Sequence, residues 1–497
     1  MAQKQATLSD LGLTAQGARE AQVTGITLDS REVMPGFLFA ALAGTQVHGG
    51  EFIQYALRQQ AGAILTDAQG ARIAAQELAE SDAAVIIAED PREALARAAA
   101  LWFAAQPKTM VAVTGTNGKT SVASFARMIW AEMGQAAINF GTTGVEGAWT
   151  APLAHTTPDA ITLHRSLAAA AEAGVTHGAM EASSHGLDQR RMDGVHLQAA
   201  GFTNLTQDHF EYHGDFEGYY AAKAGLFLRV LPQTGTAVVN TDDDWGARLA
   251  QEARAAGHAV LSVGTRAADL RIAGQRFDAT GQDLRLEFNG KAHQIRLPLI
   301  GGFQAHNVTL AAGLVIAAGA RAEEVFDTLP HLGGVRGRME LAATRANGAA
   351  IYVDYAHTPD AVKTALQAVR PHVMGRLICV LGAGGDRDPS KRRAMGAAAA
   401  AQADVVFVTD DNPRTEDPEK IRHMVRSGAP EAHEVGDRAE AILRAVDALG
   451  GGDTLVIAGK GHETYQDIDG IKHPFNDVEQ ASIAVAALDG MENGGSP

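Results

Sequence analysis

A glycine-rich segment near residue 115 carries the clearest chemical signal in this sequence. The apolar run 111–113 leads into Thr-Gly-Thr-Asn-Gly-Lys-Thr-Ser at 114–121. Glycines let backbone N–H groups approach a phosphate, a lysine adds positive charge, and a threonine hydroxyl can hold Mg²⁺. Only Thr116 and Asn117 separate the two glycines, fewer residues than in the common phosphate-binding loop. The segment therefore predicts a nucleotide-phosphate site of a compressed kind.

Three further side chains could complete such a site. Glu181 ends an apolar run, and a carboxylate at the carboxyl end of a parallel strand is a natural Mg²⁺ ligand; a solvated acid at a helix start is the alternative. His209 lies in a polar segment and could ligate a metal, although a histidine is more often only hydrogen-bonded. Lys223 lies in a helical stretch of small and apolar residues, where a solvent-facing charge is the default interpretation.

In the last third of the chain, polar or glycine-rich segments follow four predicted strands. These segments are 354–360, 382–388, 410–414 and 459–463. Any one of them could be a capped turn, but together they indicate one charged crevice. Arg387 and Arg414 could each bind a carboxylate through two N–H groups, and Asp411 and Glu463 could receive ammonium groups. Both signs of charge favour a zwitterionic ligand such as an amino acid.

Short apolar strands alternate with alanine-rich helices along the chain, which indicates an α/β protein with mostly parallel sheets. The predicted strands are 25–29, 37–41, 63–66, 84–88, 110–114, 136–140, 176–181, 199–204, 236–240, 350–354, 377–382, 405–410 and 454–458. A helix is expected over 91–105, with Asp90 as its N-cap and Pro91 at its first position. Apolar and polar residues alternate over 260–300, which favours an antiparallel insertion. The polar tail 491–497 is expected to be disordered.

The length of 497 residues suggests about three domains. Pro107 marks the first predicted boundary, and the segment 333–338 marks the second. The prediction is a small α/β domain over 1–107, a central domain with the phosphate loop and a mostly parallel sheet over 108–335, and a Rossmann-like, doubly wound domain over 336–497.

Composition excludes several classes of function. The net charge of −16 argues against nucleic-acid binding and against an anionic membrane surface. The single cysteine, Cys379, lies in an apolar run and is expected to be a buried strand residue, so no disulfide can form within the chain. No apolar stretch reaches about 18 residues and none follows the N-terminus as in a signal peptide. We expect a cytoplasmic, monomeric protein without membrane insertion.

Several of these motifs resemble those of the Mur ligase family, which makes peptidoglycan precursors. They match in order over essentially the whole chain, at 115–120, 181–186, 208–209, 306–307, 336–340 and 354–357. The segments 28–31 and 36–40 resemble the UDP-binding domain of the member that adds the third amino acid. The segment 411–414 resembles the signature of the branch that adds meso-diaminopimelate, where the lysine-adding branch typically differs.

The resemblance implies an ATP-dependent amide ligase. ATP would phosphorylate the free D-Glu carboxylate of UDP-N-acetylmuramoyl-L-Ala-D-Glu. The amine of meso-2,6-diaminopimelate would then attack the acyl phosphate, and phosphate would leave from a tetrahedral intermediate. The product would serve peptidoglycan synthesis, and through it cell shape and cell division.

The resemblance also assigns residues to ATP and Mg²⁺. The ATP-binding set is Gly115, Thr116, Asn117, Gly118, Lys119, Thr120, Ser121, Asn307, Arg338, Asp354 (at the ribose) and His357. Lys119 would neutralise charge on the transferring phosphoryl group. Thr120 and Glu181 would hold one Mg²⁺. His209 and a carbamylated Lys223 would serve a second, because a carbamate turns a cationic side chain into an anionic oxygen ligand.

The two other substrates receive residues in the same way. The UDP-substrate set is Leu28, Ser30, Thr45, Gln46, Val47, His155, Thr156, Thr157, Ser183, Gln189 and Arg191. His155 departs from the family pattern, in which another polar residue often stands. The diaminopimelate set is Arg387, Asp411, Asn412, Pro413, Arg414, Gly459 and Glu463. Arg414 is the expected discriminator, because it would pair with a distal carboxylate that lysine lacks.

Two alternatives remain at this point. Folylpolyglutamate synthase shares the ATP core of this superfamily, but the UDP-type N-terminal segments and the segment 411–414 argue against it. A nucleotide-dependent switch without ligase activity is the second alternative. Four polar strand ends in the last third argue against a switch, because a switch needs no amino-acid site.

Overall fold

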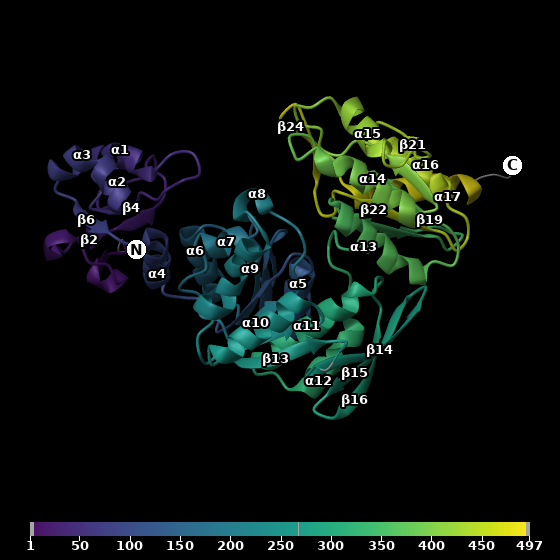
Figure 1. Ribbon diagram of the computed structural model, residues 1–497, viewed down its shortest axis with the longest axis horizontal. Coiled ribbons are helices and arrows are strands. Elements are labelled where there is room, and N and C mark those ends of the chain that lie inside the picture. Colours follow the sequence, from purple (N-terminus) through teal and green to yellow (C-terminus); the bar gives the residue numbers. More distant parts are fainter. Residues whose placement is uncertain (1–3, 267, 494–497) are drawn as a thin grey trace. The chain divides into compact units, whose positions relative to one another are not determined.

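The computed structural model describes residues 4–266 and 268–493. Its chain forms two compact units, one with Met1–Leu270 and Leu310–Val325, the other with Arg271–Thr309 and Phe326–Pro497. Both contain β-sheets with helices packed against them (Figure 1). The predicted α/β fold class is therefore confirmed. Among the described residues, no helix combines the length and the apolar character needed to cross a membrane.

The first unit begins with a small parallel sheet. Its strands lie in the order β3-β4-β5-β6, at Gly25–Thr27, Phe37–Ala40, Ala63–Thr66 and Ala84–Ile87. The other elements here are β1 (Ala6–Thr7), β2 (Gln22–Val23), α1 (Ile53–Arg58), α2 (Ala68–Ile73), α3 (Ala75–Ala79) and α4 (Pro91–Phe103). All four sheet strands lie within the ranges predicted from sequence.

The ends of α4 follow from local chemistry. The Asp90 side chain accepts the N–H of Glu93 at 3.1 Å, and Pro91 occupies the first turn, where its missing N–H is not needed. This N-cap is confirmed as predicted. The helix ends before the predicted residue 105, because Ala104 adopts a left-handed φ of 57°.

The larger sheet of the first unit has the strand order β13-β12-β11-β7-β10-β8-β9, parallel except for β9. The strands are β7 (Thr109–Thr114), β8 (Ala137–Gly141), β9 (Gly144–Gly147), β10 (His177–Glu181), β11 (Ala199–Phe202), β12 (Thr236–Asn240) and β13 (Ala259–Gly264). The helices are α5 (Lys119–Glu132), α6 (Ala160–Glu172), α7 (Ser184–Asp188), α8 (Phe210–His213), α9 (Phe216–Gly225) and α10 (Asp244–Ala255). The strands predicted for this region are confirmed with small shifts at their ends.

The antiparallel insertion predicted over 260–300 needs a correction. Its first strand, β13, pairs in parallel with β12 and extends the larger sheet. Antiparallel pairing is found between β15 (Gly281–Phe288) and β16 (Lys291–Leu297), and β14 (Leu270–Asp278) precedes them. The prediction failed for β13 because alternating polarity reports that one face of a strand is buried, not the direction in which the strand runs. Two helices follow, α11 (Phe303–Ala317) and α12 (Ala322–Thr328).

The second unit contains a sheet with the strand order β17-β18-β22-β19-β20-β21. These are β17 (Glu340–Thr344), β18 (Ala350–Asp354), β19 (Leu377–Leu381), β20 (Val405–Val408), β21 (His433–Glu434) and β22 (Thr454–Ala458). Its helices are α13 (Pro359–Val369), α14 (Ser390–Gln402), α15 (Pro418–Arg426), α16 (Arg438–Asp447) and α17 (Asp477–Asn493). All strands but β17 are parallel, so the segments that follow β18, β19, β20 and β22 meet at one edge.

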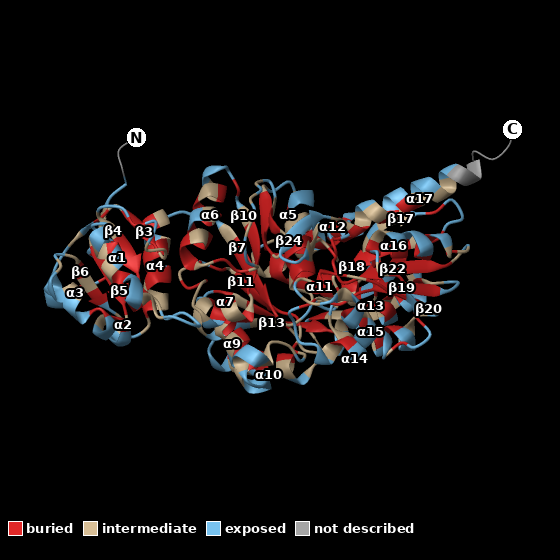
Figure 2. Ribbon diagram, turned by 90° about the horizontal axis from the view of Figure 1, so that it is seen from above, coloured by how far each residue is buried: buried red, intermediate tan, exposed pale blue. Residues whose placement is uncertain are grey.

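This sheet is covered on both faces, as expected for a doubly wound domain. Along β19, Leu377, Cys379 and Leu381 pack into one hydrophobic cluster, and Ile378 and Val380 pack into another. The inner strands β18, β19, β20 and β22 are almost wholly buried, whereas the edge strands β17 and β21 are not, and α14 and α15 expose their outer faces (Figure 2). Cys379 is a buried strand residue, as predicted, and burial raises the pKa of its thiol to about 12.

Two features near the C-terminus were not predicted. A hairpin of β23 (Tyr465–Ile468) and β24 (Ile471–Pro474) follows β22, and its Asp467 carbonyl accepts the N–H of Arg414 at 2.9 Å. The helix α17 continues through residue 493, so the prediction of disorder from residue 491 is wrong for 491–493. The remainder of the predicted tail, 494–497, lies outside the described residues.

Candidate active site

The glycine-rich loop joins the end of β7 to the N-terminus of α5, the place where a helix presents N–H groups to a phosphate. Gly115 and Gly118 have φ angles of 141° and 89°, which favour glycine. A Cβ at Gly115 would lie 1.8 Å from Thr203 Oγ1. The N–H of Thr116 donates to the Asn204 carbonyl at 2.9 Å. Both glycines are therefore required by the shape of the loop.

Two lysines point their side-chain nitrogens at this loop. Lys119 Nζ donates to the carbonyls of Gly115 and Thr116, at 2.9 and 2.8 Å. Lys223, from α9, donates to the same Gly115 carbonyl at 2.7 Å. Its Nζ also lies 4.3 Å from the centre of the Tyr219 ring. The loop therefore brings together two lysine side chains from distant parts of the sequence.

Lys223 is 1% exposed, which rules out the solvent-facing charge that was the default interpretation. Burial is the main cause that lowers the pKa of Lys223 well below its usual value, and the nearby charge of Lys119 lowers it further. The segment Leu226–Val230 directly after α9 is a π-helix, a local distortion often found at functional sites. Lys223 is thus a buried amine whose charged form is disfavoured by its surroundings.

Glu181 lies at the end of β10 beside the loop and is 2% exposed. Its Oε2 accepts the Thr120 hydroxyl at 3.0 Å, and its Oε1 accepts the Thr142 N–H at 2.8 Å. A Cβ at Gly141 would lie 1.9 Å from Oε1, so glycine is needed there. The structure therefore brings together a hydroxyl and a carboxylate, the hard oxygen donors that Mg²⁺ prefers.

His209, the predicted ligand of a second metal ion, lies between two acidic side chains and a second histidine. Its ring nitrogens lie 3.4 Å from carboxylate oxygens of Asp208 and Glu211, and the ring packs edge-on against His185. Within 4–266 and 268–493, no group of three or more His, Cys, Asp or Glu side chains is placed to hold a metal ion. A Mg²⁺ site built from one carboxylate and one hydroxyl would depend on substrate phosphates for its other ligands, as Mg²⁺ sites commonly do.

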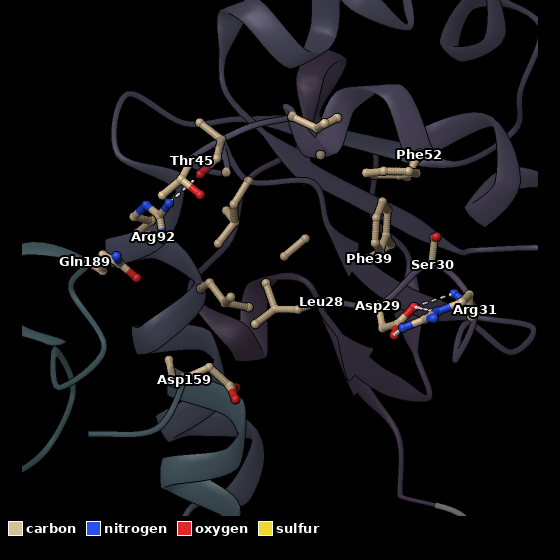
Figure 3. A pocket seen from close by; sticks show the side chains of 18 of the residues that line it. Leu28, Asp29, Ser30, Arg31, Phe39, Thr45, Phe52, Arg92, Asp159 and Gln189 are labelled. Atoms are coloured by element: carbon tan, nitrogen blue, oxygen red, sulfur yellow. Dashed lines mark hydrogen bonds and ion pairs between the residues drawn. The ribbon is translucent and has the colours of Figure 1, made fainter. Parts of the chain in front are cut away.

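A cavity of about 1030 Å³ lies in the first unit, between the N-terminal sheet and the segments around α6 and α7. Figure 3 shows apolar side chains such as Leu28 and Phe39 in its middle. The ion pair of Asp29 and Arg31 lies toward one side, and Arg92 lies on the other. An apolar middle with polar ends fits an extended ligand that carries charged groups.

The cavity gathers part of the predicted UDP-substrate set. The residues of that set that line it are Leu28, Ser30, Thr45, Val47, Gln189 and Arg191. Gln46 and His155 are exposed and are not part of its lining among the described residues. Arg92 was missed by the sequence analysis, because an arginine in the first turn of a helix carries no motif. Its guanidinium donates to the Ala43 carbonyl at the rim.

Three other members of that set have structural contacts. Thr157 is buried, and its hydroxyl donates to the Glu181 carbonyl at 2.9 Å. Arg191 donates to the Thr157 carbonyl at 2.6 Å, so Thr157 connects the end of β10 with the cavity. Ser183 is the N-cap of α7, and the Thr156 hydroxyl lies 3.1 Å from that of Thr142.

The remaining ATP-set residues belong to the second unit. Asp354, at the end of β18, accepts the N–H groups of Met339 and Ala356 at 2.8 and 2.9 Å, and burial raises its pKa. The Arg338 guanidinium lies 4.6 Å from the centre of the Tyr355 ring. His357 is exposed. Asn307, on α11, is buried and donates to Gln304 Oε1 at 3.3 Å.

The diaminopimelate set gathers at the edge of the second unit's sheet. Asp411 and Asn412 are buried, as is Pro413, and the Asn412 amide donates to Glu463 Oε2 at 2.8 Å. Arg414 has a left-handed φ of 50° and donates to the Gly385 carbonyl at 2.6 Å. Arg387 is exposed. A Cβ at Gly459 would lie 2.7 Å from Asp411 Oδ2.

Lys460 lies among Asp411, Asn412 and Glu463 and was not singled out from the sequence. It is fully buried. Its Nζ donates to Asn412 Oδ1 at 3.0 Å and Glu463 Oε2 at 3.1 Å, and lies 3.4 Å from Asp411 Oδ1. The sequence did contain a signal for Lys460, because it lies between two glycines in the polar segment 459–463 that follows a predicted strand.

Three family models match the chain: "Mur ligase family, catalytic domain" over 22–103, "Mur ligase middle domain" over 113–315, and "Mur ligase, glutamate ligase domain" over 337–461. A curated protein of Chelativorans sp., named UDP-N-acetylmuramoyl-L-alanyl-D-glutamate–2,6-diaminopimelate ligase, is 48% identical over 96% of this chain and 97% of its own. The chain belongs to the Mur ligase family. A protein of Caulobacter vibrioides with the same name is 47% identical, over 97% of this Mur ligase and 99% of its own length.

A solved structure agrees with this assignment. The structure of a UDP-N-acetylmuramoyl-L-alanyl-D-glutamate–2,6-diaminopimelate ligase matches with a TM-score of 0.72 and 33% identity, over 98% of this chain and 99% of that one. The three-domain α/β architecture predicted from sequence is therefore confirmed. This Mur ligase is an ATP-dependent amide ligase.

Proposed function

We propose that this Mur ligase joins meso-2,6-diaminopimelate to the D-Glu carboxylate of UDP-N-acetylmuramoyl-L-Ala-D-Glu, with ATP hydrolysis to ADP and phosphate. The observation that carries the proposal is similarity along nearly the whole chain to proteins named for this reaction. The charged side chains at one edge of the second unit's sheet support it, because carboxylates and arginines together suit a ligand that carries both charges. The product is a peptidoglycan precursor.

The phosphate loop supplies the first step. Backbone N–H groups of 115–121 would bind the ATP phosphates at the N-terminus of α5, and Lys119 would turn from the loop carbonyls to the transferring phosphoryl group. The Thr120–Glu181 pair would hold Mg²⁺, which neutralises phosphate charge when bound. Fixed positive groups in a buried site stabilise the developing charge more strongly than water does.

Lys223 would act as a carbamate. Burial disfavours its charged form, and the neutral amine is the form that would attack the carbon of carbon dioxide. The N–C bond would form as one C=O π bond opens onto oxygen, and the nitrogen would lose one proton to solvent. The resulting carbamate would be an anionic oxygen group beside the loop, where an ammonium would repel the cation bound there. Together with His209, it would serve the second Mg²⁺.

The two remaining substrates divide between the units. The cavity lined by Leu28, Ser30 and Arg191 would take the UDP-linked substrate, while Arg387, Asp411, Asn412, Pro413, Arg414, Gly459 and Glu463 would take diaminopimelate. Asn307, Arg338, Asp354 and His357 complete the proposed ATP set. We keep the domain boundaries 1–107, 108–335 and 336–497, which the three matched ranges support. Monomeric state and cytoplasmic location stay predictions.

An amino-acid panel tests the proposal. Phosphate release from ATP should require both the UDP-dipeptide and an amino acid, and meso-diaminopimelate should be preferred over L-lysine and L-glutamate. Acceptance of a folate with glutamate in place of the UDP-dipeptide would favour a folylpolyglutamate synthase. ATP hydrolysis that is indifferent to both substrates would contradict a ligase and favour a switch.

A further inference from the structure

We propose that Lys460 is a positioning residue that orients Asp411, Asn412 and Glu463 and sets the charge of the amino-acid site, so that the site accepts a ligand end carrying one ammonium and one carboxylate. This inference rests on the proposed function, because it concerns the diaminopimelate crevice. Lys460 acts through its three neighbours and is not assigned a contact with the ligand.

The geometry of Lys460 separates it from a ligand-binding lysine. It follows the end of β22 and is fully buried, and its Nζ lies 3.0–3.4 Å from Asn412, Glu463 and Asp411. A lysine ammonium has three N–H donors, so these three acceptors occupy all of them. Lys460 therefore connects the segment 410–414 with the segment 459–463 and fixes the distance between their acidic groups.

Lys460 also determines which way the Asn412 amide points. Asn412 Oδ1 receives Lys460 Nζ and the Asp467 N–H, both at 3.0 Å. Two donors on one side require the carbonyl oxygen there, so the NH₂ group faces Glu463 Oε2 at 2.8 Å. The carboxylate of Glu463 is thus held by both Asn412 and Lys460.

The charges around Lys460 leave room for one ligand ammonium. Asp411 and Glu463 contribute two negative charges and Lys460 one positive charge. The neighbouring Arg438 is matched by Asp477, at 2.7 and 2.8 Å with both side chains fully buried. Among the side chains that Lys460 itself contacts, the two carboxylates outnumber the one ammonium, and this local excess of negative charge favours a bound cation. With Lys460 removed, two carboxylates would face each other and would repel the carboxylate that Arg414 is proposed to bind.

The test compares Lys460→Met with Lys472→Met by steady-state kinetics. Lys472 is an exposed lysine of the adjacent hairpin, 4.3 Å from the Tyr465 ring, and makes a matched control. Lys460→Met should raise KM for diaminopimelate by about 30-fold or more, the effect of removing one partner from a buried charged network. KM for ATP should stay within about twofold, as for a distant site. The preference for diaminopimelate over L-lysine should fall by about tenfold.

A double variant separates a positioning role from an independent contact. If Lys460 acts through Glu463, then Lys460→Met combined with Glu463→Gln should raise KM little more than the larger single change. Lys460→Arg keeps the charge and should hold KM for diaminopimelate within about fivefold. Lys460→Gln replaces Lys460→Met in these comparisons if the methionine variant does not fold, as judged by circular dichroism.

Three outcomes would overturn the inference: an unchanged KM for diaminopimelate in Lys460→Met, equal increases for ATP and diaminopimelate, or fully multiplicative effects in the double variant. The failure of the proposed function looks different, because the wild-type enzyme itself would then fail to join diaminopimelate to the UDP-dipeptide.

Discussion

Two buried lysines, one in each unit, show how their surroundings give the same residue type different chemistry. Lys223 is 1% exposed and Lys460 is 0% exposed. Lys223 donates to the neutral Gly115 carbonyl and lies near the like charge of Lys119. Lys460 instead forms ion pairs with Asp411 and Glu463.

This difference separates a reactive amine from a fixed charge. Lys223 donates to a backbone carbonyl, and burial lowers its pKa well below its usual value even though the charge of Asp208 acts in the other direction. The neutral form of an amine is the one that can be modified. With two carboxylates at hand, Lys460 serves as an internal cation of the amino-acid site. The phosphate side of the enzyme is thus organised by a loop that collects positive charge, and the amino-acid side by an acidic cluster that is partly neutralised.

The largest expected effect is the loss of kcat when Lys223 is replaced. Lys223→Ala should lower kcat by about 100-fold or more, because the proposed carbamate would be lost from the phosphoryl-transfer site. Short-chain carboxylates should restore part of the activity in a phosphate-release assay. Full activity of Lys223→Ala, with an intact far-ultraviolet circular dichroism spectrum, would contradict a catalytic role.

Arg414→Ala tests the proposed amino-acid site of the second unit. It should raise KM for diaminopimelate by about 30-fold, since a proposed charged partner is removed, while KM for ATP should change by no more than about twofold. The measurement is KM for each substrate at saturating levels of the others. Equal increases for both would show that Arg414 supports the fold rather than selecting the amino acid.

Thr120→Ala should raise KM for ATP rather than KM for diaminopimelate, and the increase should be smaller than that expected for Arg414→Ala. The Thr120 hydroxyl donates to Glu181 Oε2 at 3.0 Å. Loss of a hydrogen bond to a charged group should raise KM for ATP by about tenfold, and KM for diaminopimelate should be unaffected. Thr142→Val, which removes a 3.3 Å hydroxyl contact with the same carboxylate, is the control and should have the smaller effect.

The smallest expected effect is on thermal stability, where substitutions of the two lysines should change Tm in opposite directions. At neutral pH the unfolded chain binds a proton at Lys223 that the native state disfavours, so this group lowers stability until pH rises to the unfolded value near 10.5. In protein prepared without carbon dioxide, where Lys223 is an unmodified amine, Lys223→Met should therefore raise Tm at pH 7 by about 2 °C, and this gain should vanish at high pH. Lys460→Met should lower Tm at pH 7, because two carboxylates lose their cation. A change in Tm of the same sign for both variants would contradict the proposed difference between Lys223 and Lys460.

Much of the fold could be predicted because its signals are local. Most strands of the two large sheets were recognised from short apolar runs, and the start of α4 from Asp90 and Pro91, because side-chain alternation and N-capping involve residues close in sequence. The edge strands β9, β17 and β21 were not predicted. The direction of β13 was not predictable in this way, since pairing with β12 depends on the path of the chain. The hairpin β23–β24 lacks a strong apolar pattern, as its residues are mostly polar.

Sequence alone determined the glycine positions of the phosphate loop, the strand ends that carry polar groups, and the resemblance to the Mur ligases. Those features depend on steric and chemical rules that act over a few residues. Only the tertiary structure decided that Lys223 contacts Gly115, that Thr157 links Glu181 to Arg191, and that Lys460 lies between Asp411 and Glu463. The physical reason is that burial and charge pairing arise from segments far apart along the chain, such as the 108 positions between Gly115 and Lys223.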